Sequence, residues 1–348
     1  MGLGVKWKYA VVALALLGAC KSEGGSTQPA SSVQGGASAP GGAKVAFLLS
    51  TLQEERYKKD QKYFEDAAKT HGLAPFTLSA DNDNARQLSQ IEDALSRQAK
   101  VLVIQPTDSA ASGAYVGKAH EQGAKVVAYD RFIPGADFYV AHDSYRVGVI
   151  QAEEAIKATG GKGNFVLLNG QSGHSVASEI ARGYHETLKP YVDKGDIKIV
   201  VEKNHDSWSP EQALTTVEDA LSKTKGDIAA ILANNSGMAR GAVQAIAAAN
   251  LGDKHIFIAG ADADAANVNY VCEHKQTVEV LKDIKPLAEE AATVAASLVN
   301  GKTVESKSTQ QGVAVVAVPV VLITADNAKA VALDSGFHSP AALLSCAK

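Results

Sequence analysis

The chain has 348 residues, and its 34 Lys and Arg against 38 Asp and Glu give a net charge of -4 at pH 7. This balance supplies no basic field, so it excludes a protein that binds nucleic acid through general electrostatics. The composition, with 46% hydrophobic residues, 21% charged residues and three cysteines, excludes a disordered chain and a disulfide-dense scaffold.

The N-terminus predicts a lipoprotein signal peptide over residues 1–19. Lys6 and Lys8 supply its positive start, and the apolar run over 10–17 is too short to span a bilayer. The Leu-Gly-Ala-Cys sequence that ends at Cys20 resembles a bacterial lipobox, which makes Cys20 the expected lipidation site. An ordinary signal peptide with an incidental cysteine is the alternative. No other stretch of the sequence is long and apolar enough to predict a transmembrane helix.

Residues 20–43 consist almost only of small and polar residues, so they predict a flexible linker behind the lipid anchor. The folded part is therefore expected outside the cytoplasm, in the periplasm or at the cell surface, anchored to a membrane through lipid alone. In that compartment Cys272 and Cys346 can form a disulfide, or they remain two buried thiols.

From Lys44 onward, short continuous apolar runs alternate with amphipathic helical patterns. Such runs are typical of parallel strands covered on both faces, and the alternation predicts doubly wound α/β layers. The expected strands are Val45–Leu49, Phe76–Leu78, Val101–Ile104, Lys125–Tyr129, Phe138–Val140, Asn164–Leu168, Ile197–Glu202, Ala229–Ala233, Ile256–Ala259 and Thr277–Leu281. The expected helices between them are Lys58–Thr70, Ala85–Ala99, Ala110–Gln122, Val147–Thr159, Ser178–Val192, Pro210–Ser222 and Gly237–Ala249.

These strands are too many for one comfortable sheet, and a division near Val147 gives two similar halves. A helix over Ile284–Val299 and a strand near Val313–Leu322 follow the second half, which indicates that the chain crosses back. We expect an N-terminal lobe of residues 44–147 plus about 283–311, and a C-terminal lobe of residues 148–282 plus about 312–348. Two lobes joined in this way can hinge and close around a ligand.

Polar and aromatic residues gather where the predicted strands end, which is the ligand-binding edge of open α/β sheets. The candidates are Arg56, Tyr57, Asp130 and Arg131 in the first half, and Trp208, Asn235, Asp262 and Lys282 in the second. Each has a structural alternative. Asp130 and Arg131 fit a surface ion pair, Asn235 and Asp262 fit helix N-caps, and Trp208 fits the core.

This set of side chains suits a neutral polyol. Arg, Asp and Asn exchange hydrogen bonds with neighbouring hydroxyls, and aromatic faces pack on the C–H faces of a sugar ring. The cations Arg56, Arg131 and Lys282 roughly balance Asp130 and Asp262, which favours a sugar over a phosphate or a dicarboxylate.

Enzyme and metal motifs are incomplete. The run over 170–174 lacks the final glycine of a nucleophile elbow, and no phosphate-binding glycine motif follows a strand. No histidines have metal-ligand spacing, and the acidic run over 81–84 lacks the positions that follow in a calcium loop and predicts a helix N-cap instead. We expect no catalytic residue, no cofactor and no metal.

Several segments resemble the periplasmic sugar-binding proteins of ABC importers, and the likeness runs from about Lys44 to Ser339. It implies the type I periplasmic binding protein fold, with two α/β lobes, three crossovers and a sugar between them. The segments that carry the resemblance are Val45–Leu49, Glu55–Asp60, Leu88–Glu92, Ala128–Arg131, Leu188–Asp193, Asp262–Asp264 and Gly336–His338.

The resemblance implies a role for each candidate. Hydrogen bonds to the sugar are assigned to Arg56, Asp130, Arg131, Asn235, Asp262 and Lys282, and the aromatic walls to Tyr57 and Trp208. The likeness is strongest to members that bind D-xylose, but this chain departs from their pattern. Tyr57 stands where Trp is usual, Val176 lies in a loop that otherwise contains a sugar-binding Asn, Ser236 replaces an Asp and Leu281 replaces a Tyr. D-xylose is the first candidate, and another aldopentose or a hexose stays open.

The function expected from this resemblance is capture of a monosaccharide, preferably a pentose, and its delivery to an ABC permease with its ATPase. The protein is expected to act as a monomer and not as an enzyme. Two alternatives remain: a sugar sensor that presents its closed form to a histidine kinase or chemoreceptor, and an extracytoplasmic hydrolase or isomerase.

Overall fold

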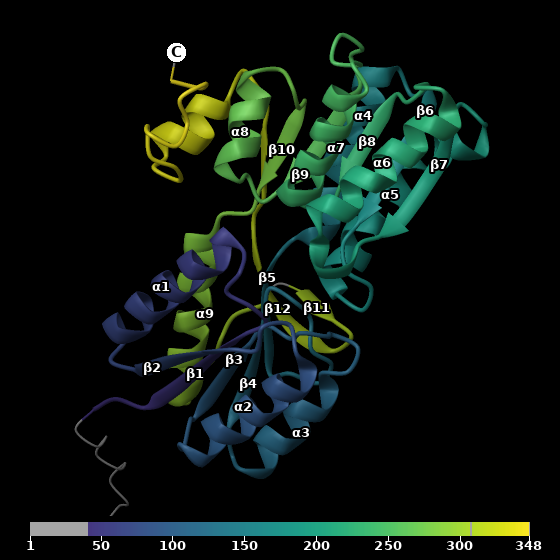
Figure 1. Cartoon of the computed structure of the whole chain (residues 1–348). Coiled ribbons are helices and arrows are strands. Elements are labelled where there is room, and N and C mark those ends of the chain that lie inside the picture. The colour runs from purple at the N-terminus through teal and green to yellow at the C-terminus, as the bar shows by residue number, and fades with distance from the viewer. Residues whose placement is uncertain (1–40, 307, 348) are drawn as a thin grey trace, which may run out of the picture. The chain divides into compact units, whose positions relative to one another are not determined.

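A computed structural model of the chain describes residues 41–306 and 308–347. This part contains a seven-stranded and a six-stranded sheet, each with helices on both faces (Figure 1). The predicted lipidation site Cys20, the signal peptide and nearly all of the predicted linker lie outside the described residues. None of the described helices combines the length and apolar character that crossing a membrane requires.

The first lobe is built on the seven-stranded sheet, in the order β2-β1-β3-β4-β5-β12-β11. Its strands are parallel except for β11, which is antiparallel to β12. The strands are β1 (Lys44–Leu49), β2 (Ala74–Ser79), β3 (Val101–Ile104), β4 (Lys125–Tyr129), β5 (Phe138–His142), β11 (Ser308–Gln310) and β12 (Val313–Val318). The helices are α1 (Glu55–Thr70), α2 (Asn84–Ser96), α3 (Gly113–Glu121) and α9 (Ile284–Val299).

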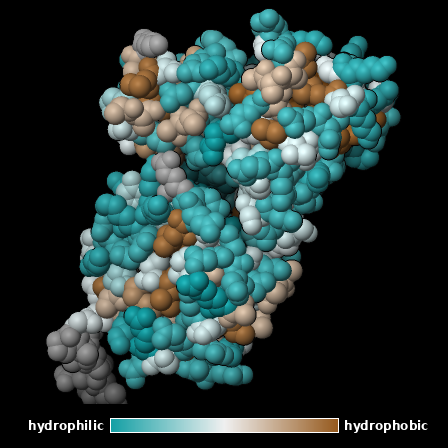
Figure 2. All heavy atoms as spheres, viewed as in Figure 1, coloured by the Kyte–Doolittle hydropathy of each residue, from teal (hydrophilic) through white to brown (hydrophobic). Residues whose placement is uncertain are grey.

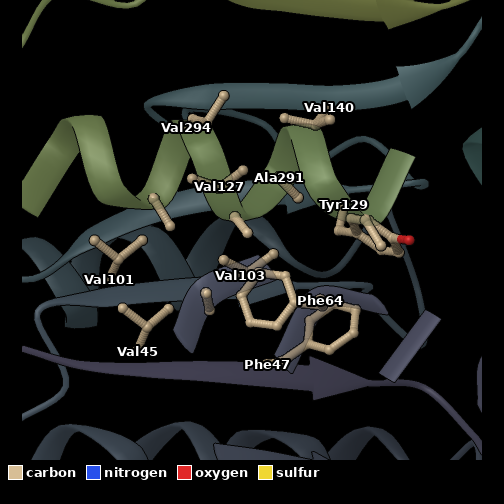
Figure 3. Close-up of a cluster of buried hydrophobic side chains, with 14 of the residues drawn as sticks. Val45, Phe47, Phe64, Val101, Val103, Val127, Tyr129, Val140, Ala291 and Val294 are labelled. Carbon is tan, nitrogen blue, oxygen red and sulfur yellow. The ribbon is translucent and has the colours of Figure 1, made fainter. Parts of the chain in front are cut away.

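Strand β1 is a continuous apolar run in the sequence because both of its faces are buried. Val45 and Phe47 pack toward α1 and α9, whereas the alternate residues Ala46 and Leu48 pack toward α2 and α3. Phe47 stacks on Phe64 of α1 with ring centroids 4.3 Å apart. Figure 3 shows the buried cluster on the first of these faces, where α9 contributes apolar side chains from a segment far along the sequence.

The second lobe repeats the same winding in a six-stranded sheet, β7-β6-β8-β9-β10-β13. Only β13 is antiparallel to its neighbour. The strands are β6 (Gly163–Asn169), β7 (Ile197–Asn204), β8 (Ala230–Ala233), β9 (Phe257–Ala261), β10 (Val278–Leu281) and β13 (Val321–Ile323). The helices are α4 (Ser144–Thr159), α5 (Ser175–Asp193), α6 (Pro210–Thr224), α7 (Ser236–Ala248) and α8 (Ala265–Cys272), with a short 3₁₀ turn η1 (Asp206–Trp208). The predicted fold of two doubly wound lobes is confirmed.

The chain passes between the two sheets three times: after β5, after β10 and after β12. The third passage corrects the predicted boundary near 311–312, because β12 pairs with β5 and belongs to the first lobe. The predicted single strand near Val313–Leu322 is likewise wrong. Pro319 has no N–H to donate to a ladder, and it separates β12 from β13, which joins the other sheet. The first passage is at Asp143, so all of α4 lies in the second lobe, slightly earlier than the predicted division near Val147.

The C-terminal segment packs against α8 and includes a π-helical turn, η2 (Lys329–Asp334). Cys272, at the end of α8, forms a disulfide with Cys346, with Cα atoms 5.3 Å apart. Figure 2 shows one face of the molecule as mainly hydrophilic, with hydrophobic residues in separate groups. Among the described residues in this view, the hydrophobic ones form no broad continuous surface.

Candidate functional site

A cavity of about 470 Å³ is lined by residues from both lobes, at the ends of their strands. All eight residues predicted from the sequence line it: Arg56, Tyr57, Asp130, Arg131, Trp208, Asn235, Asp262 and Lys282. The structure thus brings together side chains that are up to 226 positions apart in the sequence. Further lining residues are Gln53, Glu54, Val176, Ser207, Pro210, Gly237, Arg240, Asp264, Ala265 and Ala266.

Arg56 lies in the first turn of α1, directly after β1, and only 8% of its surface is exposed. Its guanidinium contacts two carboxylates of its own lobe: Nε lies 3.5 Å from Asp60, and Nη2 donates to Asp130 at 3.3 Å. A third carboxylate, that of Asp262 in the second lobe, lies 3.6 Å from Nη1. Arg56 therefore links the two lobes through charge at the centre of the cavity.

Asp130 follows β4 and is held from two sides. Gln105, which follows β3, donates its amide to Asp130 at 3.0 Å. Burial alone would raise the pKa of this carboxyl, but the positive charges of Arg56, Lys282 and Arg131 outweigh burial and hold the pKa well below its usual range. Asp130 is thus a fixed anion, ready to accept hydrogen bonds from ligand hydroxyls. Since Asp130 and Arg131 are both buried, the alternative of a surface ion pair is wrong.

Asp130 and Asp262 occupy equivalent places in the two lobes. Each follows the fourth strand of its doubly wound sheet, and each donates its backbone N–H to the next strand, Asp130 to Val140 and Asp262 to Val280. Both have positive φ, +61° and +102°, which non-glycine residues rarely adopt. Such backbone strain costs about 1–3 kcal/mol per residue and persists where the surroundings over-determine it, typically at ligand sites.

The second lobe supplies a matched set of charges. Lys282 lies at the passage from β10 to α9, and its Nζ is 2.6 Å from the carboxylate of Asp262, which follows β9. At the outer part of the cavity, Arg240 of α7 pairs with Asp264 at 2.7 Å. The cavity is therefore lined by paired anions and cations, and the near balance of their charges suits an uncharged ligand rich in hydroxyls.

Asn235 both caps helix α7 and lines the cavity. Its side-chain oxygen accepts from the N–H of Met238, so the predicted alternative of an N-cap is correct for α7, and the Nδ2 amide remains as the group that can donate to a ligand. Asp262, in contrast, is no cap, because α8 begins after Asp264.

Glu279 on β10 holds the loops that carry Asn235 and Asp262. Its fully buried carboxyl accepts from the Ser236 hydroxyl at 3.0 Å and from the Ala263 N–H at 3.1 Å. Gln276 donates to its other oxygen at 2.7 Å. Burial raises the pKa of Glu279 to about 8. One side chain on β10 thereby holds the segments that follow β8 and β9.

Two aromatic residues form walls of the cavity. The Trp208 indole lies against the backbone of Gly170, where a Cβ would come within 2.4 Å of the ring, so glycine is required there. On the first lobe, the hydroxyl of Tyr57 accepts a hydrogen bond from Arg131 at 3.3 Å, which links the Tyr57 ring to one of the charged residues that line the cavity. Trp208 also packs on both cores of the second lobe, so the core alternative describes part of its role.

Comparison with known proteins assigns the chain to a family. The model of the periplasmic binding protein domain matches residues 45–303. The chain belongs to the periplasmic binding protein family. It is 36% identical to the D-xylose-binding periplasmic protein of Escherichia coli K12, with 86% of this chain and 92% of that protein covered. It is also 28% identical to a multiple sugar-binding periplasmic receptor of Rhizobium radiobacter, over 84% of this chain and 90% of the receptor.

A solved periplasmic binding protein has the same architecture as this one. The carbohydrate transporter solute-binding protein of Chloroflexus aurantiacus, in complex with D-glucose, superimposes with a TM-score of 0.78. It is 28% identical, and the match covers 86% of this chain and 97% of the solved one. The fold class inferred from the strand and helix pattern agrees with this family.

Sequence reasoning missed several residues of this periplasmic binding protein that shape the cavity. Gln105 and Asp60 give no local signal, because their importance depends on Asp130 and Arg56, which are distant in sequence. Glu279 lies inside a predicted strand, and only the alternation Val-Glu-Val hints that it is special. Arg240 is on a helix rather than at a strand end, so the strand-end rule could not find it.

Proposed function

We propose that this protein is an extracytoplasmic solute-binding protein that captures a monosaccharide, first of all D-xylose, and delivers it to an ABC permease. The observation that carries the proposal is the single cavity lined by Arg56, Asp130, Asp262 and their neighbours from both lobes. The name of the Escherichia coli relative supports the choice of sugar, and the name of the Rhizobium relative supports testing several sugars.

The polar groups of the cavity fit sugar hydroxyls energetically. Each hydrogen bond to a charged group contributes about 1.5–3 kcal/mol. A few such bonds reach micromolar affinity, which corresponds to about -8 kcal/mol. Arg56 and Asp262 lie on different lobes, so a sugar that contacts both residues binds the closed form preferentially and shifts the population toward it. The closed form is then the signal for the permease.

Calorimetry of the purified protein against pentoses and hexoses tests the sugar class. We expect D-xylose to bind with micromolar affinity. Asp262→Asn should weaken binding by about 30-fold or more, equivalent to about 2 kcal/mol, because Lys282 loses its 2.6 Å partner and Arg56 loses the carboxylate that it contacts in the other lobe. The matched control is Asp219→Asn, an exposed residue of α6 that should bind as the wild type does. Absence of heat with every sugar, or wild-type affinity in Asp262→Asn, would contradict the proposal.

We also propose that a lipid on Cys20 holds the protein at the membrane. The support is the lipobox-like sequence before Cys20 and the polar segment after it, which can act as a tether. On cell fractionation, Cys20→Ser should move the protein from the membrane fraction to the soluble fraction. Equal distribution of the wild type and Cys20→Ser would rule out the anchor.

A further inference from the structure

His174 is the residue at which the two lobes and one wall of the cavity meet. It lies at the N-cap of α5 in the second lobe and is almost completely buried. Its Nδ1 accepts a hydrogen bond from the Trp208 indole N–H at 2.8 Å. Its Nε2 lies 2.7 Å from the carbonyl oxygen of Thr107, which follows β3 in the first lobe. One imidazole therefore connects the aromatic wall to the opposite lobe.

The two partners fix the tautomer of this imidazole. An indole N–H can only donate, so Nδ1 of His174 must carry the lone pair. A carbonyl oxygen can only accept, so Nε2 must carry the proton and donate it to Thr107. A doubly protonated ring would turn an N–H toward the N–H of Trp208 and lose that bond. The arrangement therefore requires a neutral histidine.

The surroundings also oppose a positive ring. Arg131 Nη1 lies 3.5 Å from Nε2 and, with both nitrogens acting as donors, contributes charge rather than a hydrogen bond. Burial, assisted by Arg131, lowers the pKa of His174 to about 3. Among the described residues, three other ionisable groups lie near His174. They are Asp130, Tyr57, whose hydroxyl accepts a hydrogen bond from Arg131, and Asp108, whose carboxylate packs against Gly173.

The next residue of the chain makes further contacts between the lobes. The backbone N–H of Ser175 donates to the Ser109 hydroxyl at 3.3 Å, and the Ser175 hydroxyl accepts from the N–H of Phe132 at 2.7 Å. Ser109 and Phe132 belong to the first lobe. The serine hydroxyls and backbone N–H groups in these bonds do not titrate in the physiological range. His174 is therefore the ionisable residue where the start of α5 contacts the first lobe.

We propose that His174 is a positioning residue that couples closure of the lobes to the placement of Trp208 and thereby makes ligand capture pH-dependent. The inference rests on the proposed function, because it assigns this role within the same sugar cavity. When the lobes separate, His174 loses Thr107 and Arg131 and gains water, so its pKa returns toward the ordinary value of about 6.5. The closed form needs the neutral ring, and acid therefore favours the open form.

The sign and size of the effect follow from this linkage. The pKa of His174 is lower in the closed form, so closure is fully favoured above the open-form pKa and weakens as the pH falls through it. With an open-form pKa of about 6.5, the dissociation constant should rise about 30-fold between pH 7.5 and pH 5.0. Binding at pH 6.5 should release about half a proton per ligand.

The test compares D-xylose, or another sugar of the panel that binds, across this pH range in the wild type and in His174→Gln. A glutamine amide can accept from Trp208 and donate to Thr107 but does not titrate, so His174→Gln should retain binding at pH 7.5 and have a much flatter pH profile. His185→Gln is the matched control, since His185 lies on the same helix but is exposed, and it should retain the wild-type profile. Trp208 is the one tryptophan of the sequence outside the predicted signal peptide, so its fluorescence reports ligand binding in each variant.

The outcomes separate the two proposals. If no sugar binds the wild type, the proposed function and this inference both fail. If sugar binds but the wild-type profile is flat, or if His174→Gln keeps the 30-fold change, the inference alone is overturned. If His174→Gln does not fold, wild-type calorimetry in buffers of different ionisation heat decides, because zero proton release at pH 6.5 contradicts a role for His174.

Discussion

Arg56→Met should eliminate measurable sugar binding and reduce the free energy of unfolding by about 3–5 kcal/mol. Arg56 is buried among three carboxylates: Asp60, Asp130 and Asp262. Methionine retains much of the apolar stem but leaves these carboxylates without their shared cation. Breaking a buried ion pair on one side is costly because the remaining charge stays desolvated.

Urea denaturation and calorimetry on the same preparations measure both effects. Arg86→Met is the matched control, because Arg86 pairs with Asp81 at 2.6 Å but both side chains are about half exposed. Exposed pairs contribute about 0–1 kcal/mol, so Arg86→Met should be nearly as stable as the wild type and bind sugar normally. Similar stability in Arg56→Met and Arg86→Met would show that the buried network is not what holds this part of the first lobe.

Asp60 explains why Arg56 matters for folding as well as for binding. It lies one turn further along α1, fully buried, and accepts a hydrogen bond from the hydroxyl of Tyr129. Burial raises the pKa of Asp60 to about 6, although the charge of Arg56 opposes this rise. Asp60 does not line the cavity but holds the guanidinium in place from behind. The binding residue and the core of the lobe are therefore one connected unit.

The candidate site was predictable from sequence to the extent that strand ends determine it. Asp130 and Asp262 each follow a short apolar run, and parallel strands bring such positions to one edge of a sheet. The local sequence pattern does not indicate which side chains hydrogen-bond to Asp130 or hold the loop of Asp262. Gln105 and Glu279 are buried polar residues whose meaning depends on contacts made only in the folded lobes.

The fold shows the same division between local and long-range information. Helix α9 was predicted with its observed bounds, Ile284–Val299, because its apolar periodicity is local. The short helix α8 is implied by sequence only through the N-cap alternative for Asp262, and its bounds stay unpredicted because eight residues after a polar loop give too little pattern. The third passage between the lobes was misplaced, since Val313–Val318 and Val321–Ile323 look alike in sequence and differ only in the sheet that they join.

The double substitution Cys272→Ser/Cys346→Ser should reduce the free energy of unfolding by about 4 kcal/mol in the chain-entropy account. The disulfide closes a long loop, since its cysteines are 74 positions apart, and it restricts the unfolded chain more than the folded one. In the folded protein, Cys346 and Leu343 still pack in the buried cluster with α8. Because the main effect is on the unfolded state, sugar affinity should change by less than about threefold.

Urea denaturation and calorimetry again measure the two quantities, and Cys20→Ser is the matched control for removal of a cysteine. Cys20 lies outside the disulfide and in the segment expected to act only as an anchor, so Cys20→Ser should not change the unfolding transition. The wild type under reducing conditions should behave like the double serine variant. His338 in the C-terminal segment contacts the carbonyl oxygen of Ala263, beside Asp262, at 2.7 Å. A large loss of affinity in the double variant would therefore mean that the disulfide holds this contact, and through it the Asp262 loop, in the folded state.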